Sequence, residues 1–109
     1  IEVSANRITH DIEYLIKDAL PSGIPAINQI GLLIGMSNRT LTRRLAENGL
    51  TFRDLIKKTQ LEMAKNLLKD SSRTVAEIAF ETGFSEQSAF NRAFKRWTDQ
   101  TPLEFRKNN

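Results

Sequence analysis

The stretch GFSEQSAFNRAFKRW, residues 83–97, decides how we interpret this chain. At about 100° per residue, Phe90 and Phe94 fall on one side of a helix, and Ser88 and Arg92 fall on the opposite side. Such a helix buries its aromatic stripe and turns its polar face outward. The aromatic rings would alternatively offer a stacking platform for single-stranded nucleic acid, but their shared stripe favours a place in the core. The polar face is therefore the candidate contact surface.

A related stretch lies in the first half of the chain, so the sequence contains an internal repeat. The first part of each copy matches when the chain is shifted against itself by a fixed number of residues. The second copy then contains one extra residue, so the second part matches at a shift that is longer by one. The matches are INQI over VAEI (residues 27–30 and 75–78), Gly35 over Gly83, and Leu41 and Leu45 over Phe90 and Phe94. Each copy predicts a helix, a turn that contains glycine, and a second helix that begins at a serine.

Local signals support these boundaries. They are Pro25 in the first turn of a helix, a capping box from Thr74 to Glu77, Gly35 and Gly83 at tight helix exits, and Ser37 and Ser85 as N-caps. Two short helices around a tight turn form a helix-turn-helix, although a single pair is equally common as a helical hairpin used only for packing. The two copies with basic second helices favour the helix-turn-helix.

Three further helices complete the predicted all-α fold. A helix without Gly or Pro over residues 51–69 would span about 28 Å and join the two copies. An acidic amphipathic helix over residues 5–20 serves packing, and a short helix begins at Thr101-Pro102. The predicted division of this single domain is an N-terminal helix and loop (1–22), a first helix-turn-helix (23–50), a linker helix (51–70), and a second helix-turn-helix with the C-terminal helix (73–107).

Composition narrows the possible functions. The chain has 109 residues, no cysteine and one histidine, and it contains no glycine-rich phosphate loop. We therefore predict that it is not an enzyme and has no metal or other cofactor. Its longest apolar run, residues 30–36, is far shorter than the roughly 20 residues of a membrane span, so we expect no membrane contact and a cytoplasmic location.

Charge points to a polyanionic partner. The net charge is +3, and residues 36–109 carry 14 basic and 9 acidic side chains. On the outward faces of the two second helices lie the residue types that read base edges in a major groove, although a solvated charged face is the alternative for either helix alone. These candidates are Arg39, Thr42 and Arg43 in the first copy and Gln87, Ser88, Asn91 and Arg92 in the second.

Phosphate contacts require further basic residues around these faces. The candidates are Arg44, Lys57, Lys58, Lys95, Arg96 and Arg106. For Arg44 and Arg96, ion pairing on the surface of their own lobe is the alternative.

The motifs MSNRTLTRRL (residues 36–45) and VAEIAFETGFSEQSAFNRAFKRW (residues 75–97), followed by Thr101-Pro102, resemble the AraC/XylS family of bacterial transcription regulators. The resemblance covers about residues 24–107, the DNA-binding domain of that family. It implies two helix-turn-helix lobes, with homeodomain-like three-helical subdomains, that bind adjacent major grooves of double-stranded DNA. The base-reading positions it implies are the seven named above.

The chain also departs from the family pattern at turn and packing positions. These departures are Thr98 in place of an aromatic residue, Asp99 in place of Gly, Phe105 in place of Tyr, and Thr51-Phe52 without the usual Pro. They concern the exit of the last recognition helix rather than the DNA-reading positions.

Two functional hypotheses follow. The first is sequence-specific DNA binding that regulates bacterial transcription, at the nucleoid and with RNA polymerase as a further partner. The resemblance implies that a small-molecule effector would act only through a domain absent from this chain. The second is a helical module whose basic faces meet an acidic protein, and a preference among DNA sequences would separate the two.

Overall fold

The computed structural model describes the backbone of residues 2–108 and the side chains of residues 7–108. These residues form helices without any strand, so the predicted all-α fold is confirmed. The elements are α1 (Glu2–Ala19), the 3-10 turn η1 (Leu20–Ser22), α2 (Ile27–Ile34), α3 (Asn38–Ala46), α4 (Phe52–Leu68), α5 (Val75–Glu81), α6 (Gln87–Thr98) and α7 (Pro102–Asn108). None of the helices in this part of the chain is long and apolar enough to cross a membrane.

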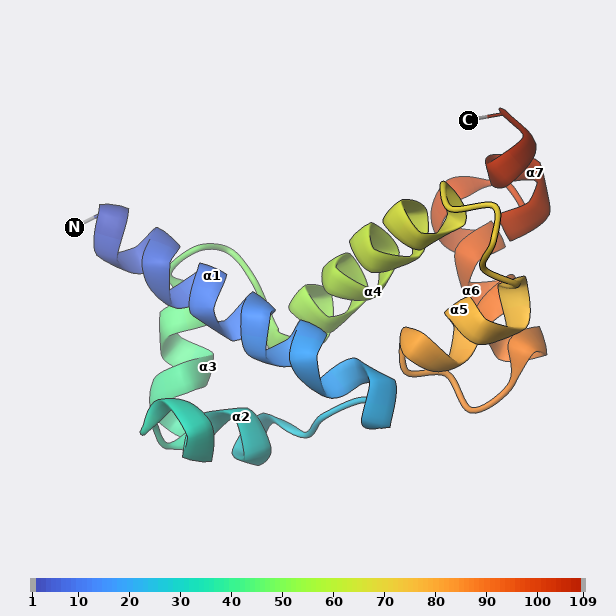
Figure 1. Cartoon of the computed structure of the whole chain (residues 1–109). Helices are drawn as coiled ribbons and strands as arrows, with labels where there is room; N and C mark the ends of the chain where they lie inside the picture. The colour runs from blue at the N-terminus through green and yellow to red at the C-terminus, as the bar shows by residue number, and fades with distance from the viewer. Residues whose placement is uncertain (1, 109) are drawn as a thin grey trace.

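The helices form two lobes, each with its own hydrophobic core (Figure 1). In the first lobe, α1, α2 and α3 pack against the beginning of α4, which contributes Leu55 and Ile56. In the second lobe, α5, α6 and α7 pack against the end of α4, which contributes Ala64 and Leu68. The prediction that one long helix contacts both lobes is therefore confirmed, and the two ends of the chain lie at opposite ends of the molecule (Figure 1).

The internal repeat appears in the hydrogen bonds that start the first helix of each pair. In the second lobe, Glu77 Oε1 accepts from the Thr74 N–H at 3.0 Å, and Thr74 Oγ1 accepts from the Glu77 N–H at 3.1 Å, as the capping box predicts. In the first lobe, Gln29 Oε1 accepts from the Ala26 N–H at 2.7 Å. Since Ala26 and Gln29 are the counterparts of Thr74 and Glu77 in the repeat, the same back-bond recurs without the hydroxyl.

The turn between the paired helices repeats as well. The Met36 N–H donates to the Gly31 carbonyl at 2.9 Å, and the Phe84 N–H donates to the Ala79 carbonyl at 3.0 Å, again at matching positions of the two copies. Gly35 ends α2 in the left-handed region at φ 75°. A residue without Cβ adopts this φ at little steric cost, so the predicted tight exit is confirmed.

The linker helix is fixed at both its start and its middle. Thr51 and Asp54 form a reciprocal capping box, with bonds of 3.0 and 3.3 Å. The 17 residues of α4 give a length of about 26 Å. Buried Gln60 donates from Nε2 to the Thr82 carbonyl at 2.9 Å, which attaches the end of α5 to the middle of α4. This bond helps to set the position of the second lobe.

Two predicted helix starts are wrong. Helix α6 begins at Gln87, and its N-cap is Glu86 without a side-chain capping bond, so Ser85 lies one residue too early to cap it. Helix α2 begins at Ile27 after the N-cap Ala26, and Pro25 is buried in the preceding loop. In both cases a plausible local signal lies one or two residues before the point at which the chain turns into the helix.

The end of α6 explains two of the departures from the family pattern. Asp99 adopts φ 64°, in the left-handed region where glycine is favoured, and it is the only non-glycine residue with positive φ in the described chain. Thr98 Oγ1 donates to the Phe94 carbonyl at 2.8 Å and accepts from the Gln100 N–H at 3.2 Å. A hydroxyl network therefore closes this turn, with the backbone in the geometry that a glycine would adopt.

Candidate nucleic-acid interface

Helix α3 is held by one cap and two buried leucines. Ser37 Oγ accepts from the Thr40 N–H at 3.2 Å, so Ser37 is the predicted N-cap. Leu41 and Leu45 are fully buried in the first core. Burial of a leucine contributes about 1.5–3 kcal/mol, which fixes the rotation of α3 about its axis. The opposite face of α3 consequently points away from the lobe.

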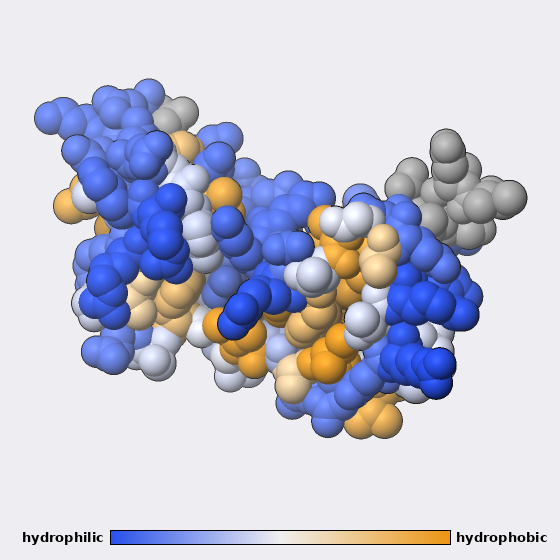
Figure 2. Space-filling view, turned by 180° about the vertical axis from the view of Figure 1, so that it is seen from behind, coloured by the Kyte–Doolittle hydropathy of each residue, from blue (hydrophilic) through white to orange (hydrophobic). Residues whose placement is uncertain are grey.

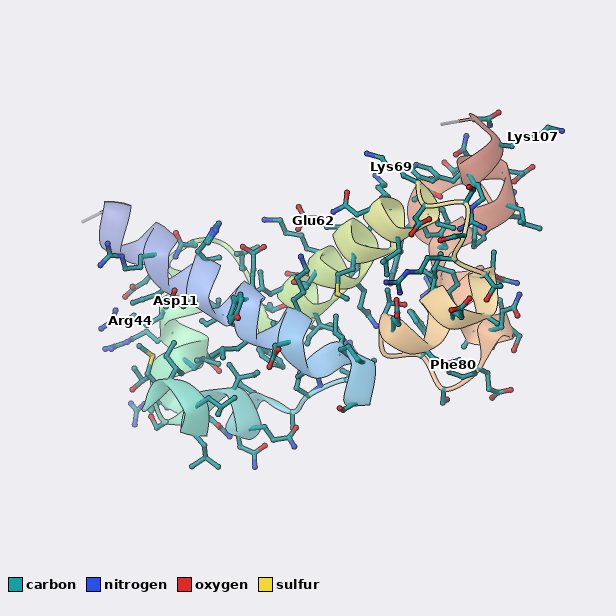
Figure 3. The ribbon with its side chains drawn as sticks, in the orientation of Figure 1. Asp11, Arg44, Glu62, Lys69, Phe80 and Lys107 are labelled. Carbon is teal, nitrogen blue, oxygen red and sulfur yellow. The ribbon has the colours of Figure 1, made fainter. Side chains whose placement is uncertain are left out.

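This outward face carries cations without partners. Arg39, Thr42 and Arg43 are exposed, as the helical positions predict. Arg44 is half-buried, and Figure 3 shows its side chain at the outer end of the first lobe. Among the described residues, none of these three arginines forms an ion pair. The alternative of a local ion pair for Arg44 therefore finds no support.

Helix α6 repeats this arrangement with aromatic anchors. Phe90 and Phe94 are fully buried, so their predicted core role is confirmed. The ring centroids of Phe84 and Phe90 lie 5.5 Å apart in an edge-to-face contact. The outward residues Gln87, Ser88 and Arg92 are exposed, and Arg92 has no ion pair with any described residue. The exposed Ser88 and Arg92 occupy the positions that Arg39 and Arg43 occupy on α3.

Asn91 differs from its counterpart in α3. Thr42 is exposed, whereas Asn91 is half-buried, and its Oδ1 is buried without a hydrogen-bond partner in the described structure. A buried, unpaired polar atom costs about 1–3 kcal/mol. The helical position alone did not indicate this burial.

The candidate phosphate contacts fall into two groups by their surroundings. Arg96 is exposed and has no ion pair among the described residues, and Lys57 Nζ lies 5.9 Å from the Trp97 ring centroid in a cation–π contact. Lys58 Nζ lies 3.2 Å from Glu13 Oε2, and Lys95 Nζ lies 3.9 Å from a Glu104 oxygen. Both paired lysines are at least half exposed, so these bonds are weak and exchangeable.

Arg106 has an internal role that the sequence did not indicate. Its Nε donates to the Leu68 carbonyl at 2.8 Å, and its Nη2 donates to the Asp70 carbonyl at 3.1 Å. These two carbonyls lie at the end of α4 and just after it, so Arg106 attaches α7 to the linker helix. Because these two bonds occupy its guanidinium group, we do not assign Arg106 to the phosphate contacts.

One basic residue near these faces escaped the sequence-based selection. Arg53 is exposed at the start of α4, one helical turn before Lys57, and it lines the same groove as Lys57 and Arg96. Arg53 and Lys57 are four residues apart, which places them on one face of α4. This spacing is the feature of the sequence from which Arg53 could have been selected.

Three carboxylates near helix starts have lowered pKa values. Hydrogen bonds from the Thr74 N–H, and secondly from the Thr74 hydroxyl, lower the pKa of Glu77 from the ordinary value of 4.5. For Glu104, the N–H and hydroxyl of Thr101 lower the pKa in the same way. The Ser72 hydroxyl and N–H lower the pKa of Asp70. The charges of Glu77 and Glu104 stabilise the starts of α5 and α7, and the charge of Asp70 lies in the turn between α4 and α5.

The comparison with known proteins identifies the family. A family described as "Helix-turn-helix domain" matches residues 33–108. The chain belongs to the AraC-type helix-turn-helix family. It is 38% identical over 106 residues to the HTH-type transcriptional regulator VqsM of Pseudomonas aeruginosa, covering 97% of this chain and 32% of that protein. It is 38% identical over 92 residues to the regulator VirS of Mycobacterium tuberculosis, covering 84% of this chain and 27% of VirS.

Solved structures agree with this AraC-type fold. The regulator CdpR from Pseudomonas aeruginosa is 32% identical, with a TM-score of 0.69 over 76% of this chain and 26% of that one. The DNA-binding domain of AdpA, solved in complex with a target DNA, is 24% identical, with a TM-score of 0.74 over 92% of this chain and 90% of that one. This second likeness concerns the fold. The chain spans about a third or less of the length of the regulators VqsM and VirS.

Proposed function

We propose that this chain binds double-stranded DNA in a sequence-specific manner and thereby regulates bacterial transcription, with α3 and α6 in adjacent major grooves. The observation that carries the proposal is the pair of matching outward faces, both rich in base-reading residue types and with unpaired arginines. The proposed base-reading residues are Arg39, Thr42 and Arg43 on α3, and Gln87, Ser88, Asn91 and Arg92 on α6.

The dimensions of the chain are compatible with two grooves. Successive major grooves on one side of DNA lie about 34 Å apart. The long axis of the molecule measures 41 Å, and α4 separates the two lobes along it (Figure 1). A molecule of this length, with a helix between its lobes, supports binding of two short DNA sequences (boxes) about one helical turn apart.

Affinity in this proposal comes from cations around the two helices. The contacts with phosphates are assigned to Arg44, Lys57, Lys58, Lys95 and Arg96. For Lys95, a phosphate would replace the exposed carboxylate of Glu104 at little cost, and for Lys58 it would replace the partly buried carboxylate of Glu13. Binding should then weaken steeply with added salt, because each phosphate contact releases counterions.

The first experiment selects the preferred duplex of this chain from a random library and measures its affinity against a scrambled duplex at two salt concentrations. Two enriched boxes about one helical turn apart support the proposal. A pool without enrichment, together with binding that depends only on salt, would contradict sequence-specific recognition.

Two substitutions then test the assignment of the recognition helices. Arg43→Ala and Arg92→Ala should each weaken binding to the selected duplex by about 1–3 kcal/mol and relax the preference in different boxes. The matched control is Arg7→Ala, since Arg7 is an exposed arginine of α1 that is not among the proposed DNA contacts. Weakening that is equal for all duplexes would assign these arginines to phosphates, and unchanged binding in both variants would exclude these helices as readers.

Protein partners form a separate part of the proposal. Leu32 on α2 is 83% exposed, and Phe80 on α5 is 52% exposed, at equivalent positions of the two copies of the repeat. We infer that these two side chains contact another protein. We assign this contact to RNA polymerase, and we expect the effector that the family resemblance implies to act through a further domain of the longer regulator. A DNA partner would place the protein at the nucleoid.

A further inference from the structure

A groove of roughly 700 Å³ lies between the two lobes. Three elements form its walls: the segment before α2, the first half of α4, and the end of α6. Figure 2 shows apolar surface in the middle of the rear face of the molecule, between hydrophilic surfaces over both ends. None of the residues that line the groove is a proposed base-reading residue.

The floor of the groove is apolar. Ile56 is buried, Phe52 and Trp97 are partly exposed, and Ile24 is 54% exposed at the edge. Ile24 belongs to the loop between η1 and α2, and its Cγ1 lies close to Gly83 of the second lobe while about half of the residue stays exposed. When an apolar body covers an isoleucine and an indole ring in an open groove, the removal of their surface from water lowers the free energy.

The rim of the groove is cationic. Arg53, Lys57 and Arg96 are exposed, and no Asp or Glu lines the groove. None of the three forms an ion pair with another described residue. Lys57 lies over the Trp97 ring, so a charge stands directly beside the apolar floor. The groove therefore combines a positive rim with an apolar base.

We infer that this groove binds a small organic anion with an apolar body, such as a carboxylate carried by a hydrocarbon chain. The carboxylate contacts Lys57 with Arg53 or Arg96, and the hydrocarbon covers Ile24 and Trp97. A binding site of this kind usually has an apolar wall with a few charged groups that orient the ligand. A DNA backbone would use the three cations but would gain little from the apolar floor, so the observations favour the small amphipathic anion.

The site has a consequence that rests on the proposed function. Lys57 and Arg96 are two of the proposed phosphate contacts, so the anion and the DNA backbone use the same cations. By thermodynamic linkage, the anion lowers the affinity for DNA by the same factor as DNA lowers the affinity for the anion. The groove would then be a place at which a small molecule inhibits DNA binding without any further domain.

Trp97 provides the first test, because it is the only tryptophan of the chain and it lines the groove. Its fluorescence is titrated with octanoate, with acetate, and with 1-octanol. A saturable change with octanoate, at least about tenfold tighter than with either control, is the expected result. The absence of a saturable change contradicts the site. Equal binding of acetate reduces it to an ion contact, and equal binding of 1-octanol reduces it to an apolar contact; both results overturn the inference.

Substitutions locate the binding. Lys57→Ala should raise the Kd for octanoate about tenfold, and Ile24→Ser should raise it by a similar factor, whereas Lys69→Ala should leave it unchanged. Lys69 is an exposed lysine at the far end of the same helix (Figure 3). Far-ultraviolet circular dichroism verifies that each variant is folded. Octanoate binding that is equally tight in all three variants overturns the assignment to this groove.

The link to DNA is tested separately on the selected duplex. Octanoate should weaken binding of that duplex, and acetate at the same concentration should not. If octanoate binds but the affinity for DNA is unchanged, the linkage is wrong. If no duplex is preferred but the Trp97 titration saturates, the proposed DNA function fails and the groove site stands, so the two failures are distinguishable.

Discussion

Asp99 shows how one residue sets the exit of a recognition helix. It adopts φ 64° at the C-terminal end of α6, where a Cβ atom crowds the backbone. Its negative charge also lies at the negative end of the helix dipole. The Thr98 hydroxyl bonds hold the turn, so the geometry persists despite these unfavourable terms. A substitution that removes these unfavourable terms should therefore stabilise the folded protein.

Replacement of Asp99 by glycine should raise the free energy of unfolding by about 1 kcal/mol, because glycine adopts positive φ without this strain. Urea unfolding measures the change. The matched control is Asp18→Gly in helical α1, where glycine gains nothing and should lower the stability by about 1 kcal/mol. A loss of stability in Asp99→Gly would mean that the aspartate side chain makes a favourable contact at this turn.

Asn91 shows the opposite conflict, between stability and recognition. Its Oδ1 is buried without a partner, and either orientation of the amide leaves a polar atom in that place. Asn91→Leu should raise the free energy of unfolding by about 1 kcal/mol, since the unpaired polar atom is removed and the branched shape of the side chain is kept. The same variant should lose its preference at one position of the second box, because leucine cannot donate to a base.

Urea unfolding and binding to a set of single-base duplex variants measure the two effects of Asn91→Leu. The exposed neighbour Ser88 provides the comparison, because Ser88→Ala should change the stability little. Lower stability of Asn91→Leu would show that the surroundings of this amide do not accept an apolar side chain. An unchanged base preference would remove Asn91 from the proposed readers.

At the scale of the elements, the charged caps make the second lobe sensitive to acid. The pKa values of Glu77 and Glu104 are below 4.5, and the pKa of Asp70 is below 3.8. A carboxylate with a lowered pKa in the folded state stabilises fully above its ordinary value and loses this contribution as the pH falls through the lowered value. Stability should therefore fall between about pH 5 and pH 3.

The variant Glu77→Gln tests this dependence. Glutamine keeps a carbonyl oxygen for the Thr74 N–H but does not titrate, so the variant should be less stable than the parent at neutral pH, and the difference should shrink as the pH falls. Unfolding curves at several pH values measure it. Two curves that stay parallel down to about pH 3 would exclude Glu77 as a source of the acid sensitivity.

Most of the elements could be predicted from the sequence because local chemistry determines them. The capping boxes at Thr51 and Thr74, the N-cap Ser37 and the exit at Gly35 are short-range signals, and each is present in the structure. Ser85 failed as a cap because Glu86 is extended and delays α6 to Gln87. A serine one residue too early carries the same local signal as a true cap.

Features that depend on contacts between elements could not be predicted in this way. Arg106 bonds to Leu68 across 38 residues, and the buried Oδ1 of Asn91 depends on how α6 packs within its lobe. The groove at Arg53 exists only because two lobes and a loop meet there. Helical periodicity identified exposed positions for six of the seven candidate readers, Asn91 excepted, since the direction of a side chain on a helix follows from spacing.

At the scale of the whole molecule, the orientation of the lobes depends on close packing at Gly83. A Cβ at this position would lie 2.9 Å from Leu20 Cδ2, 3.2 Å from Ile24 Cγ1 and 3.4 Å from the Leu20 carbonyl oxygen. The turn of the second helix-turn-helix therefore rests directly on η1 of the first lobe. Gly35, its counterpart in the repeat, has a similar positive φ, but a Cβ there would meet no atom within 4 Å.

The pair Gly35→Ala and Gly83→Ala separates backbone strain from the spacing of the lobes. Both variants should lose about 1 kcal/mol through positive φ, and Gly83→Ala should lose more, because its methyl group, 2.9 Å from Leu20 Cδ2, must displace either that buried side chain or the two lobes. In the proposed DNA complex, this shift should weaken binding to a duplex with both boxes and leave binding to a single box unchanged. Gly35→Ala should bind both duplexes as the parent does. Fluorescence anisotropy with the two duplexes measures the difference, and equal affinities of the two variants for the two-box duplex would mean that η1 does not set the distance between the recognition helices.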